Sequence, residues 1–351
     1  MRRVSQIHVI AALGTRRRRS TMFRRVALLI PALRTVRASD GCPGGVCRSF
    51  YAAPEGGTTA ASYSDAPHVP EGFHNYSLLS KRDAGRASKL LTFALPDAMA
   101  TLGARVISGV KVRQEVAGEV LDKSYSPSSH SEAAGTFDLL VKAYEPRQGG
   151  GLGAWLCGLA PGDVASMKVK PAKKLANGGP LGRAQYARIG MLAGGTGVAP
   201  FMNLAATLLA DPEDATLLDL VVSHSFPEDA MLRDELEALA TSSGGRLRVH
   251  HTFSRADGDG SAPASARAAG SSPFSDGAGR IDARVAAAML PAATDADVLV
   301  LICGTDGFVD SMAGGIQRVR DPVTNVKSKI QGPTTGVLGS LGFAPSQVFK
   351  L

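Results

Sequence analysis

The chain has 351 residues, of which 44% are hydrophobic and 20% charged, so it is long enough for two globular domains. Its net charge of +8 comes from the first 39 residues, which hold ten arginines and no acid; the remaining chain carries 29 basic against 31 acidic residues. A near-neutral remainder without a basic stripe interleaved with aromatic residues excludes a nucleic-acid-binding domain.

The arginine-rich start of the chain is typical of an organellar transit peptide, because it contains Ser and Thr but no acidic residue. We therefore expect residues 1–40 to direct the protein to mitochondria, with plastids as the alternative destination. The other interpretation is a disordered tail without a targeting function. The longest apolar run there, Val26 to Leu33, has eight residues, whereas a membrane span needs about 20. We expect no transmembrane span and leave a peripheral membrane association open.

Two segments have the composition of connectors. Residues 41–71 are rich in Ala, Gly, Ser and Pro and are expected to link the transit peptide to the first domain. The stretch from Ala256 to Gly279 is similarly simple and is expected to form a mobile loop. The four cysteines (Cys42, Cys47, Cys157 and Cys303) are too scattered for a disulfide framework, and neither they nor the seven histidines have metal-ligand spacing.

Residues 72–182 have the pattern of a small antiparallel β-barrel. Strand-like segments cover residues 90–95, 137–144 and 164–170, with turn residues between them and few helical patterns. We expect this barrel to form the first of two domains.

Residues 183–351 instead alternate strands with helices. Strand patterns cover 189–193, 217–222, 246–253 and 298–302; helical patterns follow Pro200 and cover 228–240 and 282–290. Strands and helices that alternate in this way build βαβ units, so the second domain is expected to be an α/β fold with a parallel sheet.

A glycine-rich turn follows the first strand of this second domain. Gly194, Gly195 and Gly197 allow a phosphate to approach the backbone, Thr196 adds a hydroxyl, and the helix that begins near Pro200 directs its N–H groups to the same point. Cys303 and Gly304 also follow a strand, and ligands of parallel sheets bind at the carboxyl ends of strands. The sequence therefore predicts a nucleotide-binding cleft that both segments border.

Five ordered motifs, spread over residues 72–351, resemble those of the NADH–cytochrome b5 reductases within the ferredoxin–NADP reductase superfamily. They are Lys123-Ser-Tyr-Ser-Pro127; Val141-Lys-Ala-Tyr144; Gly149 to Leu156 with Pro161-Gly-Asp163; the turn from Gly194 to Gly197 with Pro200; and Cys303-Gly304 with the terminal run from Gln331 to Leu351.

The resemblance implies two cofactors, FAD on the barrel and NADH, with NADPH as a second donor, on the α/β domain. Ser126 and Cys303 would be the catalytic residues, beside the flavin and the nicotinamide respectively. The FAD-binding residues would be Lys123, Tyr125, Ser126, Pro127, Leu140, Lys142, Tyr144, Gly150, Gly151, Leu152 and Gly153. The dinucleotide-binding residues would be Gly194, Gly195, Thr196, Gly197, Pro200, Cys303 and Gly304.

The chain departs from the family pattern at several positions. Lys123 replaces an arginine, Gly153 a serine, and Leu351 the final aromatic residue, while Thr305 to Phe308 replace a proline-rich segment. These departures imply weaker retention of FAD, because an ammonium group cannot grip a phosphate with two parallel hydrogen bonds as a guanidinium can.

The function that the resemblance implies is a flavoprotein oxidoreductase that moves hydride from NADH to FAD and then passes single electrons to a haem protein such as cytochrome b5. A quinone or another small redox protein is an alternative acceptor. The alternative from another class is a degenerate relative kept as a structural subunit or assembly factor of an organellar complex.

Overall fold

The computed structural model describes residues 68–116, 118–143, 151–176, 178–255, 272–320, 325 and 327–351. The expected transit peptide, most of the expected linker and two of the expected FAD-binding residues, Tyr144 and Gly150, lie outside the described residues. Within the described part, none of the helices is long and apolar enough to cross a membrane.

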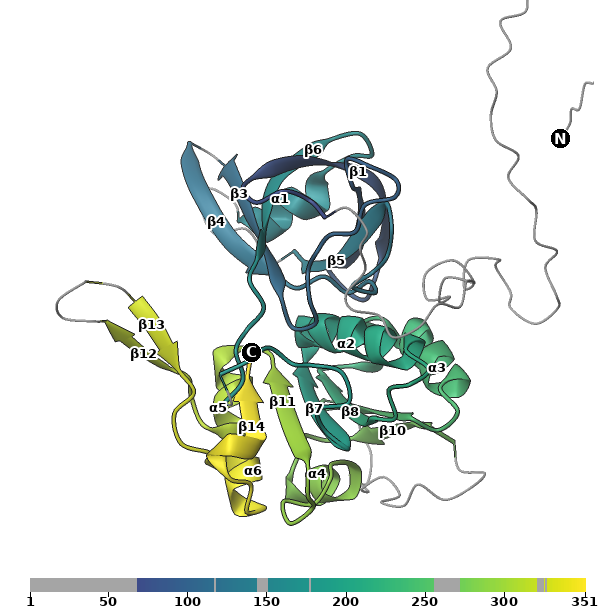
Figure 1. Ribbon diagram of the computed structural model, residues 1–351, viewed down its shortest axis with the longest axis vertical. Coiled ribbons are helices and arrows are strands. Elements are labelled where there is room, and N and C mark those ends of the chain that lie inside the picture. Colours follow the sequence, from purple (N-terminus) through teal and green to yellow (C-terminus); the bar gives the residue numbers. More distant parts are fainter. Residues whose placement is uncertain are drawn as a thin grey trace, which may run out of the picture. The chain divides into compact units, whose positions relative to one another are not determined.

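The first domain is the expected antiparallel barrel (Figure 1). Its strands are β1 (His74–Asp83), β2 (Ser88–Ala94), β3 (Gly109–Val116), β4 (Glu119–Tyr125), β5 (Thr136–Lys142) and β6 (Val164–Lys170), paired in the order β4-β3-β6-β1-β2-β5. An antiparallel bridge between Pro127 and Leu139 joins the chain after β4 to β5. This bridge connects the two edges of the sheet, so the sheet closes on itself.

Aromatic side chains fill the interior of the barrel. Tyr76 and Phe93 both pack against Phe137, with ring centroids 5.2 and 5.6 Å apart. The short helix α1 (Leu152–Gly158) adds Leu152 and Leu156 to the same apolar cluster. On β6 the buried Ala165 and Met167 alternate with more exposed neighbours, since one face of the strand lines the core.

The second domain is a six-stranded parallel sheet in the order β10-β9-β8-β7-β11-β14. Its strands are β7 (Arg188–Gly194), β8 (Leu217–His224), β9 (Leu247–Phe253), β10 (Phe274–Ala278), β11 (Val298–Cys303) and β14 (Val348–Lys350). The helices are α2 (Ala199–Ala210), α3 (Arg233–Ser242), α4 (Ala283–Met289), α5 (Asp306–Ala313) and α6 (Gly336–Ser340), with the short helices η1 (Gly195–Val198), η2 (Pro227–Asp229) and η3 (Pro345–Gln347).

Three sequence expectations about this domain were wrong in detail. The expected helix over 228–240 is split into η2 and α3, with Leu232 in a left-handed conformation at φ 54° between them. The strand expected over 246–253 has alternating apolar and polar residues, which predicts one exposed face, yet every residue of β9 is buried, because β9 lies inside the sheet with both faces covered. The expected loop over 256–279 includes β10, which pairs with β9; residues 256–271 lie outside the described part.

A hairpin of two short strands, β12 (Gln317–Arg320) and β13 (Lys327–Ile330), extends from the second domain (Figure 1). No strand was expected from the sequence at either position. All four residues of β12 are exposed, so the hairpin has no apolar face whose periodicity could have indicated a strand.

The barrel and the α/β domain share one apolar cluster. Leu90, Ile107 and Leu140 of the barrel pack in it together with Phe201 and Leu204 of α2. Polar contacts lie beside this cluster, where the side chain of Asn203 donates to the carbonyl of Ser129 and the hydroxyl of Ser131. The cleft between the two domains therefore has walls that are fixed by a common core.

Candidate functional site

The glycine-rich turn lies between β7 and α2, as expected, and it packs directly against the end of β11. A Cβ atom added to Gly197 would lie 2.1 Å from the carbonyl oxygen of Cys303, far inside van der Waals contact. Only glycine fits there. The close approach of the turn to the end of β11 therefore explains why residue 197 is a glycine, independently of any ligand. The backbone of Gly195 is left-handed, with φ at 54°, which also favours glycine.

The turn opens into a cleft of about 620 Å³ between the two domains. Its lining includes most of the residues that the motifs predicted: Lys123, Tyr125, Ser126, Leu140, Lys142, Gly194, Gly195, Thr196, Gly197, Pro200, Cys303 and Gly304. These residues are distributed over β4, β5, the glycine-rich turn and the end of β11, and the fold brings them to one cavity.

The barrel wall of the cleft is formed by the ends of β4 and β5. The Lys123 ammonium lies 5.6 Å from the centre of the Tyr125 ring, within the range of a cation–π contact. Lys142, the last residue of β5, adds a second cation to the same wall. Two lysines beside an aromatic face suit a ligand that combines a flat ring with phosphate groups.

Four of the expected FAD-binding residues are not in the lining of this cavity, namely Pro127, Gly151, Leu152 and Gly153. Pro127 is buried and forms the bridge to β5, and Leu152 belongs to the barrel core. Gly153 packs so closely on β5 that an added Cβ would lie 2.7 Å from the carbonyl oxygen of Lys142. The glycine at 153 therefore has a packing role, beyond the missing hydroxyl that the family comparison emphasised.

The segment after Gly304, where the chain departs from the family pattern, forms a regular helix start. The Thr305 hydroxyl accepts a hydrogen bond from the backbone N–H of Phe308 and caps α5. The Phe308 ring then packs on two glycines, since a Cβ on Gly194 or Gly304 would lie 2.8 or 2.6 Å from it. Where the family has a proline-rich segment, this chain thus has a helix start whose Phe308 ring lines the cleft.

The Cys303 thiol borders the cleft in its protonated form. Burial raises the pKa of this thiol to about 11. The residue therefore contributes a small, uncharged surface at neutral pH rather than a thiolate nucleophile.

Further lining residues were missed by the motif comparison. They are Ala199, Ser223, His224, Ser225, Asp229 and Met231. Ser223, His224 and Ser225 lie at the carboxyl end of β8, next to the glycine-rich turn. The rule that places ligands at such ends could have identified them, had it been applied to every strand of the sheet.

The composition of the cleft fits two dinucleotides. The barrel side supplies an aromatic face and two lysines, while the α/β side supplies free backbone N–H groups at a helix start and several hydroxyls. When bound, FAD supplies the capacity to accept a hydride and release single electrons. The protein's own contribution is to position the dinucleotides between two walls and to exclude water.

Comparisons with known proteins agree with this arrangement. The family model for the oxidoreductase FAD-binding domain matches residues 75–186, and the model for the oxidoreductase NAD-binding domain matches residues 191–313. NADH-cytochrome b5 reductase 1 of Laccaria bicolor is 28% identical over 269 residues, which cover 75% of this chain and 79% of that protein. The NADH-cytochrome b5 reductase-like protein of Arabidopsis thaliana is 27% identical over 292 residues, or 80% of this chain and 77% of that protein.

A solved structure, the cytochrome b5 reductase domain of Ulva prolifera nitrate reductase, aligns with a TM-score of 0.54 and 26% identity over 68% of this chain and 89% of that domain. A ferredoxin NADP+ reductase from Neisseria gonorrhoeae shares the fold at 17% identity and a TM-score of 0.53. The chain therefore belongs to the FAD- and NAD-binding oxidoreductases of the ferredoxin–NADP reductase superfamily, and its curated relatives are NADH–cytochrome b5 reductases.

Proposed function

We propose that this oxidoreductase uses NADH as its donor and passes electrons singly to an acidic haem protein such as cytochrome b5. The names of the curated relatives support the donor and the class of acceptor. The observation that carries the choice of an acidic acceptor is a group of three lysines, Lys170, Lys173 and Lys329, which we call the lysine patch. It lies beside the cleft, since Lys170 contacts the lining residue Ser124.

The lysine patch gathers residues from three parts of the chain. Lys170 ends β6 and donates to the hydroxyl of Ser124, a cleft residue, at 3.1 Å. Lys173 follows in the connector, and burial together with the charges of Lys329 and Lys170 lowers its pKa to about 8. Burial and the charges of Lys329 and Lys111 likewise lower the pKa of Lys170. The three ammonium groups of the lysine patch therefore lie close enough to repel one another, and Lys111 also repels Lys170.

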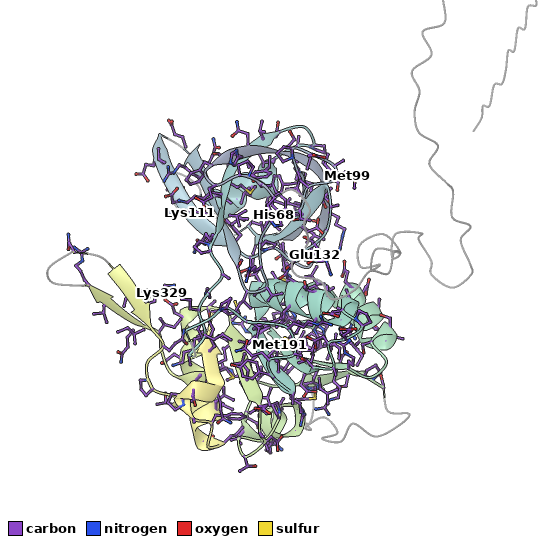
Figure 2. The ribbon with its side chains drawn as sticks, viewed as in Figure 1. His68, Met99, Lys111, Glu132, Met191 and Lys329 are labelled. Carbon is purple, nitrogen blue, oxygen red and sulfur yellow. The ribbon has the colours of Figure 1, made fainter. Side chains whose placement is uncertain are left out.

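Mutual repulsion makes this surface favourable for an acidic partner, since each carboxylate brought to it relieves repulsion as well as forming a new contact. In Figure 2, Lys111 on the barrel and Lys329 on β13 both lie on the side of the molecule where the hairpin extends. On the strand paired with that of Lys329, β12 presents the exposed Arg320, whereas the exposed Arg318 is already paired with Asp306. A partner with an acidic rim around its redox group would be steered to the mouth of the cleft.

The test compares reduction of oxidised cytochrome b5 by the wild type and by Lys329→Glu at several salt concentrations. The variant should reduce cytochrome b5 several-fold more slowly at low ionic strength, and the difference should disappear at high salt. Flavin reduction by NADH, measured without acceptor, should be unchanged. Lys89→Gln on β2, outside the lysine patch, is the control; it removes a charge without setting a carboxylate against Asp83, the ion-pair partner of Lys89, and it should react like the wild type.

Equal rates for Lys329→Glu and wild type at low salt would contradict docking on the lysine patch. If the protein reduces a quinone but not cytochrome b5, the quinone is the acceptor and the proposed haem protein is not. A purified protein that is colourless and takes up no FAD would instead favour the structural or assembly role.

We also propose that the protein acts in mitochondria, because its first 39 residues are arginine-rich and free of acid. A fusion of residues 1–40 to a fluorescent protein should localise with a mitochondrial marker. Localisation to plastids, or a diffuse signal, would contradict this part of the proposal.

A further inference from the structure

A short segment after β4 is hydrogen-bonded to both domains. Residues 126–131, which we call the flavin loop, begin at the cleft, where Ser126 of the expected flavin motif is part of the lining. On the barrel side, the Ser128 N–H donates to the carbonyl of Asp138 at 2.9 Å, and the Ser129 hydroxyl accepts from the Asp138 N–H at 3.0 Å. Asp138 belongs to β5, so these bonds fix the flavin loop to the barrel.

The flavin loop is also bonded to α2, the helix that begins at the glycine-rich turn. The Asn203 amide donates to the carbonyl of Ser129. The Ser131 hydroxyl accepts from the Asn203 amide nitrogen at 3.1 Å and donates to the amide oxygen at 3.3 Å. Thr207 accepts from the Ser131 N–H at 3.1 Å and donates to the Asn203 carbonyl at 2.7 Å. We call these four residues, Ser129, Ser131, Asn203 and Thr207, the polar latch.

The polar latch lies close to the cleft on both of its sides. Pro200, Asn203 and Thr207 share one face of α2, because residues three and four apart on a helix are neighbours. Pro200 lines the cleft, so Asn203 lies one helical turn from it. Ser126 also lines the cleft and is three residues from Ser129. The polar latch therefore joins the wall expected to meet the flavin to the wall expected to meet the nicotinamide dinucleotide.

Adhesion between the domains does not depend on the polar latch alone. Phe201 and Leu204, on either side of Asn203, pack in the apolar cluster that the two domains share. Apolar burial is non-directional, so it holds two surfaces together without fixing their exact position. Hydrogen bonds depend on distance and angle, and a fully bonded buried network specifies one arrangement. Asn203 is 5% exposed and belongs to such a network.

Hydride transfer depends strongly on exact position, because the reacting atoms must lie about 3–3.5 Å apart and a displacement of about 1 Å costs roughly 100-fold in rate. We propose that Asn203 is a positioning residue for hydride transfer, which fixes α2 relative to the flavin loop. Asn203 acts through the two walls, since the cleft lining among the described residues does not include it. The inference rests on the proposed transfer of hydride from NADH to FAD and is independent of the electron acceptor.

The test uses the FAD-loaded protein without an acceptor. It measures the rate of flavin reduction at saturating NADH by stopped-flow absorbance, and the Kd of NAD+ by calorimetry. Asn203→Leu keeps the side-chain volume but removes the amide, so flavin reduction should slow about 10- to 100-fold. The Kd of NAD+ should change less than about twofold and the FAD content should not change, because the ligand contacts remain. Ser131→Ala removes one partner of the amide and should slow the reaction about 3- to 10-fold; it also serves if Asn203→Leu does not fold.

A second readout needs no turnover. When NAD+ is added without oxygen to protein whose flavin dithionite has reduced, overlap of the two rings gives a charge-transfer absorbance band at long wavelength. At saturating NAD+ this band should be clearly weaker in Asn203→Leu than in the wild type, since the rings no longer overlap in the same way. Equal bands in the two proteins would overturn the proposal.

Glu235→Gln is the matched control. It breaks the ion pair between Glu235 of α3 and Arg82 of β1, which also joins the two domains but involves neither the flavin loop nor α2. This variant should reduce its flavin at the wild-type rate. An equal slowing in Glu235→Gln would assign the effect to general adhesion between the domains and overturn the proposal.

Two further results would overturn it. One is a wild-type rate of flavin reduction in Asn203→Leu and Ser131→Ala; the other is a loss of NAD+ affinity or FAD content that accounts for the slower rate. A failure of the proposed function is distinguishable from these results, because NADH would then leave the flavin of the wild type itself oxidised.

Discussion

Replacing His251 with phenylalanine should make the protein markedly more resistant to mild acid. Burial is the first cause that lowers the pKa of His251, to about 3 from the ordinary 6.5, and the charges of His224, Arg233 and His250 lower it further. Below about pH 6.5 the unfolded chain takes up a proton at this residue that the folded protein does not. The free energy of unfolding therefore falls by about 1.4 kcal/mol for each pH unit until the folded pKa is reached.

Between about pH 7.5 and pH 4.5 this single residue should cost the wild type about 3 kcal/mol, a large part of the roughly 5–15 kcal/mol typical of a folded domain. His251→Phe removes the proton uptake and keeps an aromatic ring against Phe253 and Phe274. The measurement is urea unfolding of the FAD-loaded protein, followed by circular dichroism at both pH values. The difference in unfolding free energy between variant and wild type should grow by about 3 kcal/mol on acidification. Parallel pH profiles would refute a buried, neutral His251.

Three other substitutions test the cleft. Tyr125→Ala combined with Ser126→Ala should lower the FAD content or the rate of flavin reduction by NADH, and unchanged values for both would remove these residues from the flavin site. Gly153→Ser should lower stability by about 1–3 kcal/mol through overpacking and should not tighten FAD binding, as thermal unfolding and flavin fluorescence titration would show. Ser254 lines the cleft just after β9, and Ser254→Asp should raise the preference for NADH over NADPH, because an acid that meets the adenosine ribose repels the 2′-phosphate of NADPH. An unchanged ratio of catalytic efficiencies for the two donors would show that this phosphate does not bind near Ser254.

The strands that bury one or both faces were largely predictable from the sequence. Val164–Lys170 and Val298–Cys303 carry enough apolar residues to mark their positions, and the glycine-rich turn identified the nucleotide cleft. The fold class followed from these segments, because strands that alternate with helices have few other ways to bury their apolar faces.

The parts that escaped prediction lack a local signal. Phe274–Ala278 is a short strand next to a low-complexity stretch, and only its pairing with β9 makes it a strand. The exposed hairpin β12–β13 has no buried face.

The role of Gly153 and the stacking of His224 on His251 also lay beyond sequence reasoning. Gly153 is constrained by the carbonyl of Lys142, 11 residues earlier in the chain, and His224 by a ring on the neighbouring strand. Such constraints arise from tertiary contacts, which the sequence pattern around each residue does not contain.

The most direct test of the account is stopped-flow absorbance without oxygen, in which the FAD-loaded protein is mixed with NADH and then with oxidised cytochrome b5. We predict that the flavin bands bleach with NADH alone, and that the haem is then reduced while the flavin bands return. Flavin bands that NADH leaves unchanged, or a haem that stays oxidised in the presence of bleached protein, would contradict it.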